Sequence, residues 1–329
     1  MEEDGAGPPP CRAGPYHVRV PGRLPARPGE HSTTTAEKAR IAEIEAGEVP
    51  CWYPTTPFGD DREMWRGGHR DHGVSRVCNF WTKRNLWALA RLWMEAGNAD
   101  SRLQPTVKFT ITGLMQAASR MNRHEPSFTA SILPGTLYVG ALIEEASVDR
   151  LWRPRISKTI AMCRDIGRLS AAICSTESAT QLSGIHASTV DYVFVDPPFG
   201  SNIFYADCSL LWESWLGYFT DERFEAVWNR SKKPAQGGKS LDDYERLMTE
   251  GFREMYRVLK PGRWASVVFH NSDARVWQAI QRGAVAAGFD LVNALQLDKV
   301  QLTFKGLKGK KGQENVTNKD VVLRPVKEA

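Results

Sequence analysis

The stretch VFVDPPFG, residues 193–200, decides the fold class of this chain of 329 residues. Residues 191–196 are rich in Val, Phe and Tyr, a composition that favours a β-strand. The prolines that follow end the strand, because proline cannot donate a hydrogen bond to a neighbouring strand. In an open α/β sheet, ligands bind beyond the carboxyl ends of the strands. We therefore expect residues 196–199 to lie where such a sheet carries its site.

Strand-like and helix-like segments alternate on both sides of this stretch. Such alternation predicts a mostly parallel sheet with helices on both faces. The last two strands have no helix between them, so we expect them to pair as an antiparallel hairpin at the sheet edge. The predicted strands are 191–196, 264–270, 289–297 and 320–326, and residues 137–143 are predicted to be a strand or an extended segment. The predicted helices are 156–172, 209–219, 241–259 and 274–288.

The composition of the chain changes along its length. Residues 1–35 are rich in Pro and Gly, and we expect a disordered tail because they cannot bury enough apolar surface to offset the entropy of ordering. Residues 36–136 form a Trp-rich region that we expect to be helical, and residues 137–329 form the α/β part. Helices are predicted at 36–47, with Thr35 as a cap and Gly47 as a stop, at 79–97 and at 106–121.

The helix predicted at 79–97 carries Leu86, Leu89, Ala90 and Trp93 at helical spacing. These four residues are expected to face a core. Tryptophans recur in the same segment at positions 81, 87 and 93, steps that do not place all three on one face of a helix. We interpret them as packing residues in preference to residues that stack on bases.

Composition limits the class of protein and its partners. The formal net charge of +5 is compatible with a polyanionic partner but is weak evidence by itself. No run of about 18 apolar residues occurs, so no membrane span is predicted. The six cysteines contain no C-x-x-C pair, so neither a zinc ribbon nor a disulfide framework is indicated, and no metal site is predicted. This cysteine usage, and a start without a secretory signal, favour a reducing, cytoplasmic location.

The four residues Asp196-Pro197-Pro198-Phe199 offer a definite chemistry as well as a position. A carboxylate at Asp196 and a backbone carbonyl fixed by Pro197 can accept hydrogen bonds from both N–H groups of an amine and hold its nitrogen near tetrahedral. Phe199 can stack on a base, a contact worth about 1–3 kcal/mol. A base inside a duplex cannot reach such a pocket, so extrusion from the stack is implied. The alternative is that Asp-Pro-Pro only begins a loop.

The segment DYVFVDPPFGSNIFYADCSLLWESWLG (191–217) resembles the D-P-P-F/Y motif and following helix of adenine-specific and related N-4/N-6 amino DNA methyltransferases. RVLKPGRWASVVFHNSD (257–273) resembles the helix, turn and strand after that motif. NFWTKRNLWAL (79–89) resembles a block of larger bacterial enzymes of this kind, so the resemblance covers about residues 48–327.

The resemblance implies an α/β, Rossmann-like methyltransferase sheet, complete or incomplete, with a helical N-terminal addition. It makes residues 137–329 the catalytic half of a methyltransferase that acts on an amino group of a DNA base, with adenine favoured. It also implies that the catalytic residues are Asp196, Pro197, Pro198 and Phe199, and that Asn202 and Tyr205 line the target pocket or the path of the strand.

Such enzymes use S-adenosyl-L-methionine, and the usual element that binds it is a strand followed by a Gly-rich turn. The sequence contains no such element: GAGPPP (5–10) follows no strand, and FKGLKGKKG (304–312) has no acidic strand before it. We therefore favour a chain whose cofactor half is lost, split off or encoded separately, which would bind S-adenosyl-L-methionine poorly alone. The composition of residues 1–35 supports this interpretation, and a degenerate cofactor site within 105–145 is the alternative.

The resemblance places Ser175 and Thr176 where related enzymes have a strand end that contacts the adenine of the cofactor, and a plain surface loop is the alternative for both. DNA is the expected partner. Its phosphates are candidates for contact by the first turn of the helix at 79–97 and by the basic loop at 304–312. The alternatives are the polar start of a helix and a solvated loop. The proposed contact residues are Lys83, Arg84, Lys305, Lys308, Lys310 and Lys311.

Two other functions stay open from the sequence. D-P-P-F/Y-G also occurs in RNA methyltransferases that act on base amino groups, although no added RNA-binding module is recognisable here. A catalytically inactive remnant that binds nucleic acid without the cofactor half is the second, and the absence of the Gly-rich turn is its main support.

Overall fold

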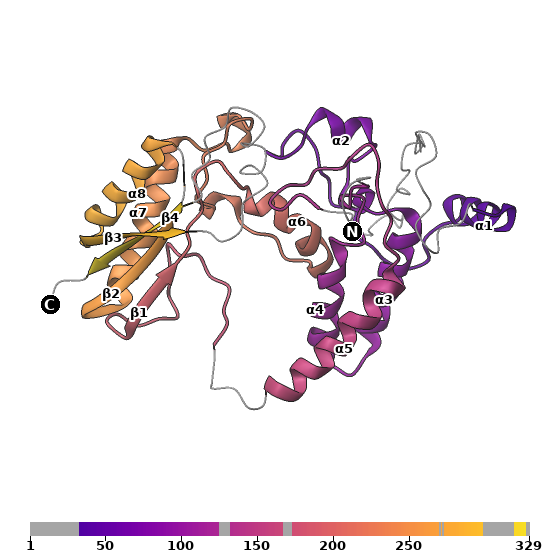
Figure 1. Ribbon diagram of the computed structural model, residues 1–329, viewed down its shortest axis with the longest axis horizontal. Helices are drawn as coiled ribbons and strands as arrows, with labels where there is room; N and C mark the ends of the chain where they lie inside the picture. Colours follow the sequence, from indigo (N-terminus) through magenta and orange to yellow (C-terminus); the bar gives the residue numbers. More distant parts are fainter. Residues whose placement is uncertain are drawn as a thin grey trace, which may run out of the picture. The chain divides into compact units, whose positions relative to one another are not determined.

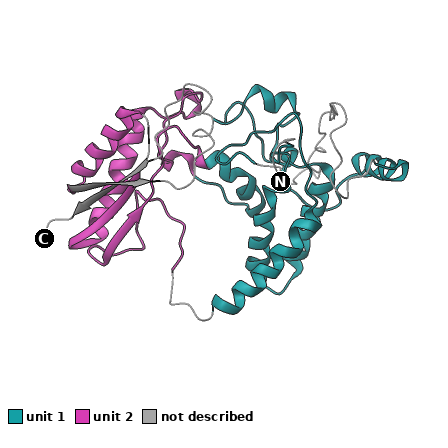
Figure 2. Cartoon of the chain, viewed as in Figure 1, with its two compact units in different colours: residues 1–172, 206–220 teal, residues 173–205, 221–329 magenta. Residues whose placement is uncertain are grey.

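The computed structural model describes residues 33–124, 132–166, 173–269, 271, 273–298 and 319–326. The chain divides into two compact units (Figure 2). Unit 1 comprises residues 1–172 and 206–220, and unit 2 comprises residues 173–205 and 221–329. The domain boundaries at residues 35 and 136 stay predictions, and most of the predicted tail at 1–35 lies outside the described residues.

Unit 1 is helical in its described part (Figure 1). Its longest helices, α3 and α5, each extend over four or more turns, since an α-helix has about 3.6 residues per turn. The first residue of α6 belongs to unit 2 and the rest of that helix to unit 1. The elements are α1 (Thr35–Ala46), α2 (Gly67–Asp71), the 3-10 turn η1 (Val77–Phe80), α3 (Lys83–Asn98), α4 (Gln104–Met115), α5 (Val148–Ile166) and α6 (Tyr205–Leu216).

The core of unit 1 confirms the pattern read in the segment 79–97. Thr82 caps α3 by accepting a hydrogen bond from the backbone N–H of Asn85. The four apolar residues at helical spacing, 86, 89, 90 and 93, are all buried. Trp215 of α6 lies among the tryptophans, and its ring meets the edges of Trp81, Trp93 and Trp52 with ring centroids 5.5–6.0 Å apart. Trp81 and Trp93 are therefore packing residues, as expected.

Several predicted bounds in unit 1 are wrong. The cap of α1 is Thr34, one residue before the expected Thr35, and Gly47 ends the helix as predicted. Helix α4 ends at Met115 instead of 121, and α5 begins at Val148, well before the predicted 156. Pro154 lies inside α5. Because an interior proline removes a helical hydrogen bond, the sequence indicated a later start.

The segment 137–143, predicted to be a strand or an extended segment, does not form a strand. Leu137 and Val139 are buried in the core of unit 1, so the apolar pattern is real, but no strand of the described part of the chain pairs with it. A single bridge joins Ile143 to Arg123, and the carbonyl of Leu137 is hydrogen-bonded to the ring Nε2 of His69 at 2.8 Å. The apolar residues that suggested a strand are therefore buried in the core of unit 1 without being part of a sheet.

Unit 2 contains a sheet of four described strands in the order β1-β2-β4-β3. Strands β1 and β2 are parallel, whereas β4 pairs antiparallel with both β2 and β3. The antiparallel hairpin predicted for the last two strands is confirmed, with β3 at the edge and β4 inside. The elements are β1 (Val190–Val195), the 3-10 turns η2 (Glu222–Phe224) and η3 (Pro234–Gln236), α7 (Leu241–Val258), β2 (Leu259–Phe269), α8 (Ala274–Ala286), β3 (Asp290–Asp298) and β4 (Lys319–Val326).

The expectation of a mostly parallel sheet with two covered faces is wrong for the described strands. Helices α7 and α8 pack on the same face (Figure 1), against residues that include Val193, Val195 and Val267. On the other face, the side chains of Tyr192, Phe194 and Trp264 are 54%, 65% and 43% exposed. The alternation of strand side chains between the two faces places these aromatic residues together.

Four of the six cysteines, Cys51, Cys163, Cys174 and Cys208, are free thiols. The absence of a disulfide framework and the cytoplasmic location stay predictions. Among the described residues, no helix combines the length and the apolar character that crossing a bilayer requires.

Candidate active site

The loop that follows β1 lies at the carboxyl end of the parallel pair β1 and β2. Asp196 is the first residue after the strand and is exposed, whereas Pro197 and Gly200 are buried. Asn271 comes shortly after the carboxyl end of β2, so both parallel strands deliver polar side chains to the same edge of the sheet. This is the position that the sequence predicted for the site.

The backbone of this loop is fixed by hydrogen bonds from three other parts of unit 2. Carbonyls 198, 199 and 200 each accept one hydrogen bond, whereas the carbonyl of Pro197 accepts none from the part of the chain that the structure describes. The donors are the Tyr244 hydroxyl of α7 to Pro198 at 2.8 Å, the Asn271 side-chain Nδ2 to Phe199 at 2.9 Å, and the Trp228 backbone N–H to Gly200 at 3.2 Å.

The ring of Phe199 is part of the apolar core of unit 2. It meets Phe269 of β2 edge-on with ring centroids 5.2 Å apart, and Phe269 meets Trp277 of α8 at 4.9 Å. The indole N–H of Trp277 donates to the backbone carbonyl of Asn271 at 2.8 Å. Phe199 is half-buried in this arrangement, so packing fixes its orientation. Its stacking on a base stays a prediction.

Gly200 has a backbone conformation that only glycine adopts readily, with φ of +68°. A Cβ atom at this position would lie 3.2 and 3.3 Å from the two methyl groups of Val276. The loop can therefore turn back over the start of α8 only because residue 200 has no side chain.

Tyr244 contributes a neutral donor to the site. Its side chain is fully buried, and burial raises the pKa of the hydroxyl well above its usual range. The hydroxyl therefore stays protonated and donates to the carbonyl of Pro198 at any ordinary pH.

Two of the residues after the motif, those predicted to line the target pocket or the path of the strand, are exposed in unit 2. Asn202 is exposed, and Tyr205, the first residue of α6, is 43% exposed. Ser175 and Thr176 are exposed in an irregular segment, not at the end of a strand. That segment continues along α7, where Ala179 lies beside Gly251. The predicted roles of these four residues in binding base or cofactor stay predictions.

The proposed phosphate contacts are found in two different situations. The Lys83 ammonium donates to the backbone carbonyl of Glu45 at 2.8 Å, and the Arg84 guanidinium pairs with the carboxylates of Glu45 and Glu145. Both side chains hold the start of α3 within unit 1, which is the structural role that the sequence left open. The four lysines of the basic loop, at 305, 308, 310 and 311, lie outside the described residues.

Three residues that hold the loop were not identified as site residues from the sequence. Asn271 belongs to the segment 257–273 that resembles the region after the motif, and Asp273 in that segment caps α8. Tyr244 and Trp228 gave no comparable signal. Tyr244 is one apolar position of an amphipathic helix, and only the fold shows that its hydroxyl meets Pro198.

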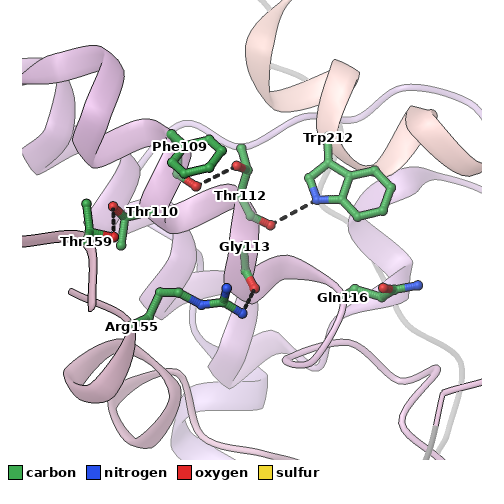
Figure 3. A pocket seen from close by; sticks show the side chains of 8 residues that line it. All are labelled: Phe109, Thr110, Thr112, Gly113, Gln116, Arg155, Thr159 and Trp212. Atoms are coloured by element: carbon green, nitrogen blue, oxygen red, sulfur yellow. Dashed lines mark hydrogen bonds between the residues drawn. The ribbon is translucent and has the colours of Figure 1, made fainter. Parts of the chain in front are cut away.

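Unit 1 contains a separate cavity of about 190 Å³ (Figure 3). The Arg155 guanidinium of α5 donates to the carbonyl of Gly113 at 2.9 Å, and the indole N–H of Trp212 in α6 donates to the carbonyl of Thr112 at 2.9 Å. Two neighbouring helices are thereby tied to the backbone of α4. The cavity is lined by Phe109, Thr110, Thr112, Gly113, Gln116, Arg155, Thr159 and Trp212.

Comparison with known proteins finds no protein-family model and no curated protein that matches the chain. Three similar solved structures are of one protein from Thermus thermophilus, described as a "putative DNA modification methylase", and one of them is complexed with S-adenosyl-L-methionine. The first is 17% identical, with a TM-score of 0.28, over 47% of this chain and 53% of that one. The S-adenosyl-L-methionine complex is 20% identical, with a TM-score of 0.28, over 47% and 54%.

The chain therefore spans about half the length of the solved structures that it matches.

Proposed function

We propose that this chain carries the amine-binding face of a methyltransferase that acts on an exocyclic amino group of a DNA base, most favourably adenine. One observation carries the proposal. Asp196 is exposed and directly precedes Pro197 in the chain, no described residue donates to the Pro197 carbonyl, and the next three carbonyls are each held by a hydrogen bond from the protein.

This arrangement suits an amine with two N–H groups. Asp196 would accept a hydrogen bond from one and the Pro197 carbonyl from the other, which draws the nitrogen lone pair out of conjugation with the ring. The hydrogen bonds from Tyr244 and Asn271 fix the loop before the base arrives, and acceptors held in place in this way need no reorganisation during the reaction. The carboxylate is also placed to accept the proton that the nitrogen releases on methylation.

S-adenosyl-L-methionine is the methyl donor that this chemistry implies, but the described residues do not form a complete site for it. In the described sheet, β1 is an edge strand, and no Gly-rich turn between a strand and a helix lies beside it. We propose that a separate polypeptide supplies the donor site. We propose that this polypeptide binds at the exposed aromatic side chains of Tyr192, Phe194 and Trp264, since exposed apolar patches can be interaction sites.

The amine-binding proposal is testable with the isolated chain. The probe is a DNA duplex with one extrahelical base, either adenine or purine, which lacks the amino group. Wild-type protein should bind the adenine duplex more tightly, by about 1–3 kcal/mol, because purine leaves both acceptors unpaired. Asp196→Asn should reduce this preference several-fold. Asp191→Asn is the matched control, since Asp191 is an exposed carboxylate near the start of the same strand and pairs with Lys260.

Equal affinity of the wild-type protein for adenine and purine would contradict the proposal. A preference for the same bulge in RNA over DNA would favour the second candidate, an RNA base-amino methyltransferase.

If a donor-binding polypeptide is found, Asp196→Ala should abolish methyl transfer in the assembly, and retained transfer would favour some other catalytic residue. The inactive remnant predicts nucleic-acid binding with no transfer in any assembly.

The partner proposal has its own measurement. The isolated chain should show no micromolar binding of S-adenosyl-L-methionine in a calorimetric titration, and micromolar binding would show that this chain holds the donor site itself. A cytoplasmic location follows from the proposed function and stays part of the proposal.

A further inference from the structure

A basic loop, residues 229–239 with the sequence NRSKKPAQGGK, is attached to the site loop of unit 2. Its ends are closed by two hydrogen bonds, from the Asn229 N–H to the Lys239 carbonyl at 2.9 Å and from the Lys239 N–H to the Asn229 side chain at 2.8 Å. Trp228, the residue just before it, donates its backbone N–H to Gly200. The loop therefore begins one residue from a direct contact with the site loop.

The basic loop has a built shape. The Gly238 N–H donates to the carbonyl of Lys233 at 2.9 Å, and a Cβ atom on Gly238 would lie only 2.1 Å from the carbonyl oxygen of Lys232. Gly237 has φ of +81°. A turn that excludes side chains at these positions holds the backbone in one compact conformation, so its charged side chains are presented from a fixed base.

The charges of this loop are of one sign. It contains Arg230, Lys232, Lys233 and Lys239 and no acidic residue. Lys232 and Lys239 turn inward, since their ammonium groups contact the carboxylate and the backbone carbonyl of Glu222. The exposed cationic side chains of the loop are therefore Arg230 and Lys233, and Arg230 also interacts with the Asp273 carboxylate.

Trp228 adds an aromatic surface between two guanidinium groups. The Cζ atoms of Arg275 and Arg230 lie 5.0 and 5.6 Å from the centre of its ring, which is cation–π distance. Asp273 binds Arg275 through Nε and Nη2. The other edge of that guanidinium, formed by Nη1 and Nη2, has no second protein acceptor within the described ranges. Such an edge matches two oxygens of a phosphate group.

We propose that Arg230 and Arg275, whose guanidinium groups lie against Trp228, together with the exposed Lys233 of the basic loop, bind backbone phosphates of the nucleic acid next to the base held by the site loop. The inference rests on the proposed function and names the phosphate contacts of that same site. Phosphate contacts fix register and orientation without reading sequence. The hydrogen bond from the Trp228 N–H to the Gly200 carbonyl joins this phosphate-binding surface to the site loop, so the bound nucleic-acid strand would run beside the extruded base.

The test is the salt dependence of duplex affinity, measured by fluorescence anisotropy with the extrahelical adenine duplex. Each phosphate contact contributes about 0.9 to the slope of log affinity against log salt. The triple variant Arg230→Gln, Lys233→Gln, Arg275→Gln should therefore make this negative slope shallower, reducing its magnitude by about 2–3. The matched control is the triple variant Arg253→Gln, Lys260→Gln, Arg263→Gln, which removes the same charge near the end of α7 and the start of β2, away from the site loop. This control should leave the slope nearly unchanged.

Equal slopes for the triple variant and wild type, or equal losses in the triple variant and the control, would overturn the inference. A single variant, Lys233→Glu, keeps the test valid if the triple variant unfolds, because Lys233 is exposed and its change should lower the slope by about 1. The proposed function is judged separately by the preference for adenine over purine. A slope change without that preference would support the phosphate surface and reject the amine site.

Discussion

The hydroxyl of Tyr244 donates a hydrogen bond to the backbone carbonyl of Pro198 at 2.8 Å. The two residues are 46 positions apart in the chain. Through this bond the first turn of α7 holds the loop that follows β1. Together with Asn271, which lies 72 positions beyond Phe199, it makes the site loop depend on the folding of unit 2 as a whole.

Tyr244→Phe should lower the free energy of unfolding by about 1–3 kcal/mol, because the half-buried carbonyl of Pro198 loses its donor while the ring volume is kept. Chemical denaturation of the two proteins measures this difference. Tyr218→Phe is the control, since its side chain is 81% exposed and should cost little. An equal effect of both substitutions would argue that the Tyr244 hydroxyl does not stabilise the loop.

Alkaline pH should destabilise the wild-type protein through the same residue. Burial raises the pKa of Tyr244 in the folded state above that of an unfolded tyrosine, about 10. Its contribution is fully present below pH 10 and is lost as the pH rises further, because the unfolded chain then releases the proton that the folded chain keeps. The free energy of unfolding should fall less steeply above pH 10 in Tyr244→Phe. Identical slopes would contradict the assigned burial effect.

Gly200→Ala should destabilise unit 2 more than Gly262→Ala does. Both glycines have positive φ, +68° and +69°, so both variants bear the strain of a left-handed alanine, about 1–2 kcal/mol. Only at Gly200 does the new methyl group also meet a neighbour, Val276, whereas the space at Gly262 is open. Thermal unfolding of the two variants compares them directly, and equal melting temperatures would show that the Val276 contact relaxes without cost.

Trp215→Ala should be among the most damaging changes in unit 1, at about 3–5 kcal/mol, because it removes the ring against which Trp81 and Trp93 pack. Trp215 is 2% exposed, and its indole N–H has no hydrogen-bond partner within the described part of the chain, so the expected loss is one of packing. Trp52→Ala, at a ring that is 59% exposed, should cost much less. Denaturant titration followed by helix content tests the ranking, and the reverse order would contradict it.

The sequence by itself determined the local elements of this protein. The start of α7 at Leu241, the buried stripe of α3, the cap of α8 at Asp273 and the strand before Asp196 were all predictable. Each depends on hydrophobic period, a capping residue or a proline, and these signals act over a few neighbouring residues. The antiparallel pairing of the last two strands was also predictable, because no helix separates them.

Only the tertiary structure decided which of these elements meet. It placed β4 between β2 and β3, left one face of the sheet with exposed aromatic residues, and gave 137–143 a buried but unpaired role. It also brought Tyr244, Asn271 and Trp228 to three consecutive carbonyls of the site loop. These contacts join residues far apart along the chain. Local periodicity contains no information about such pairs, because it records which side of an element is apolar and not which neighbour covers it.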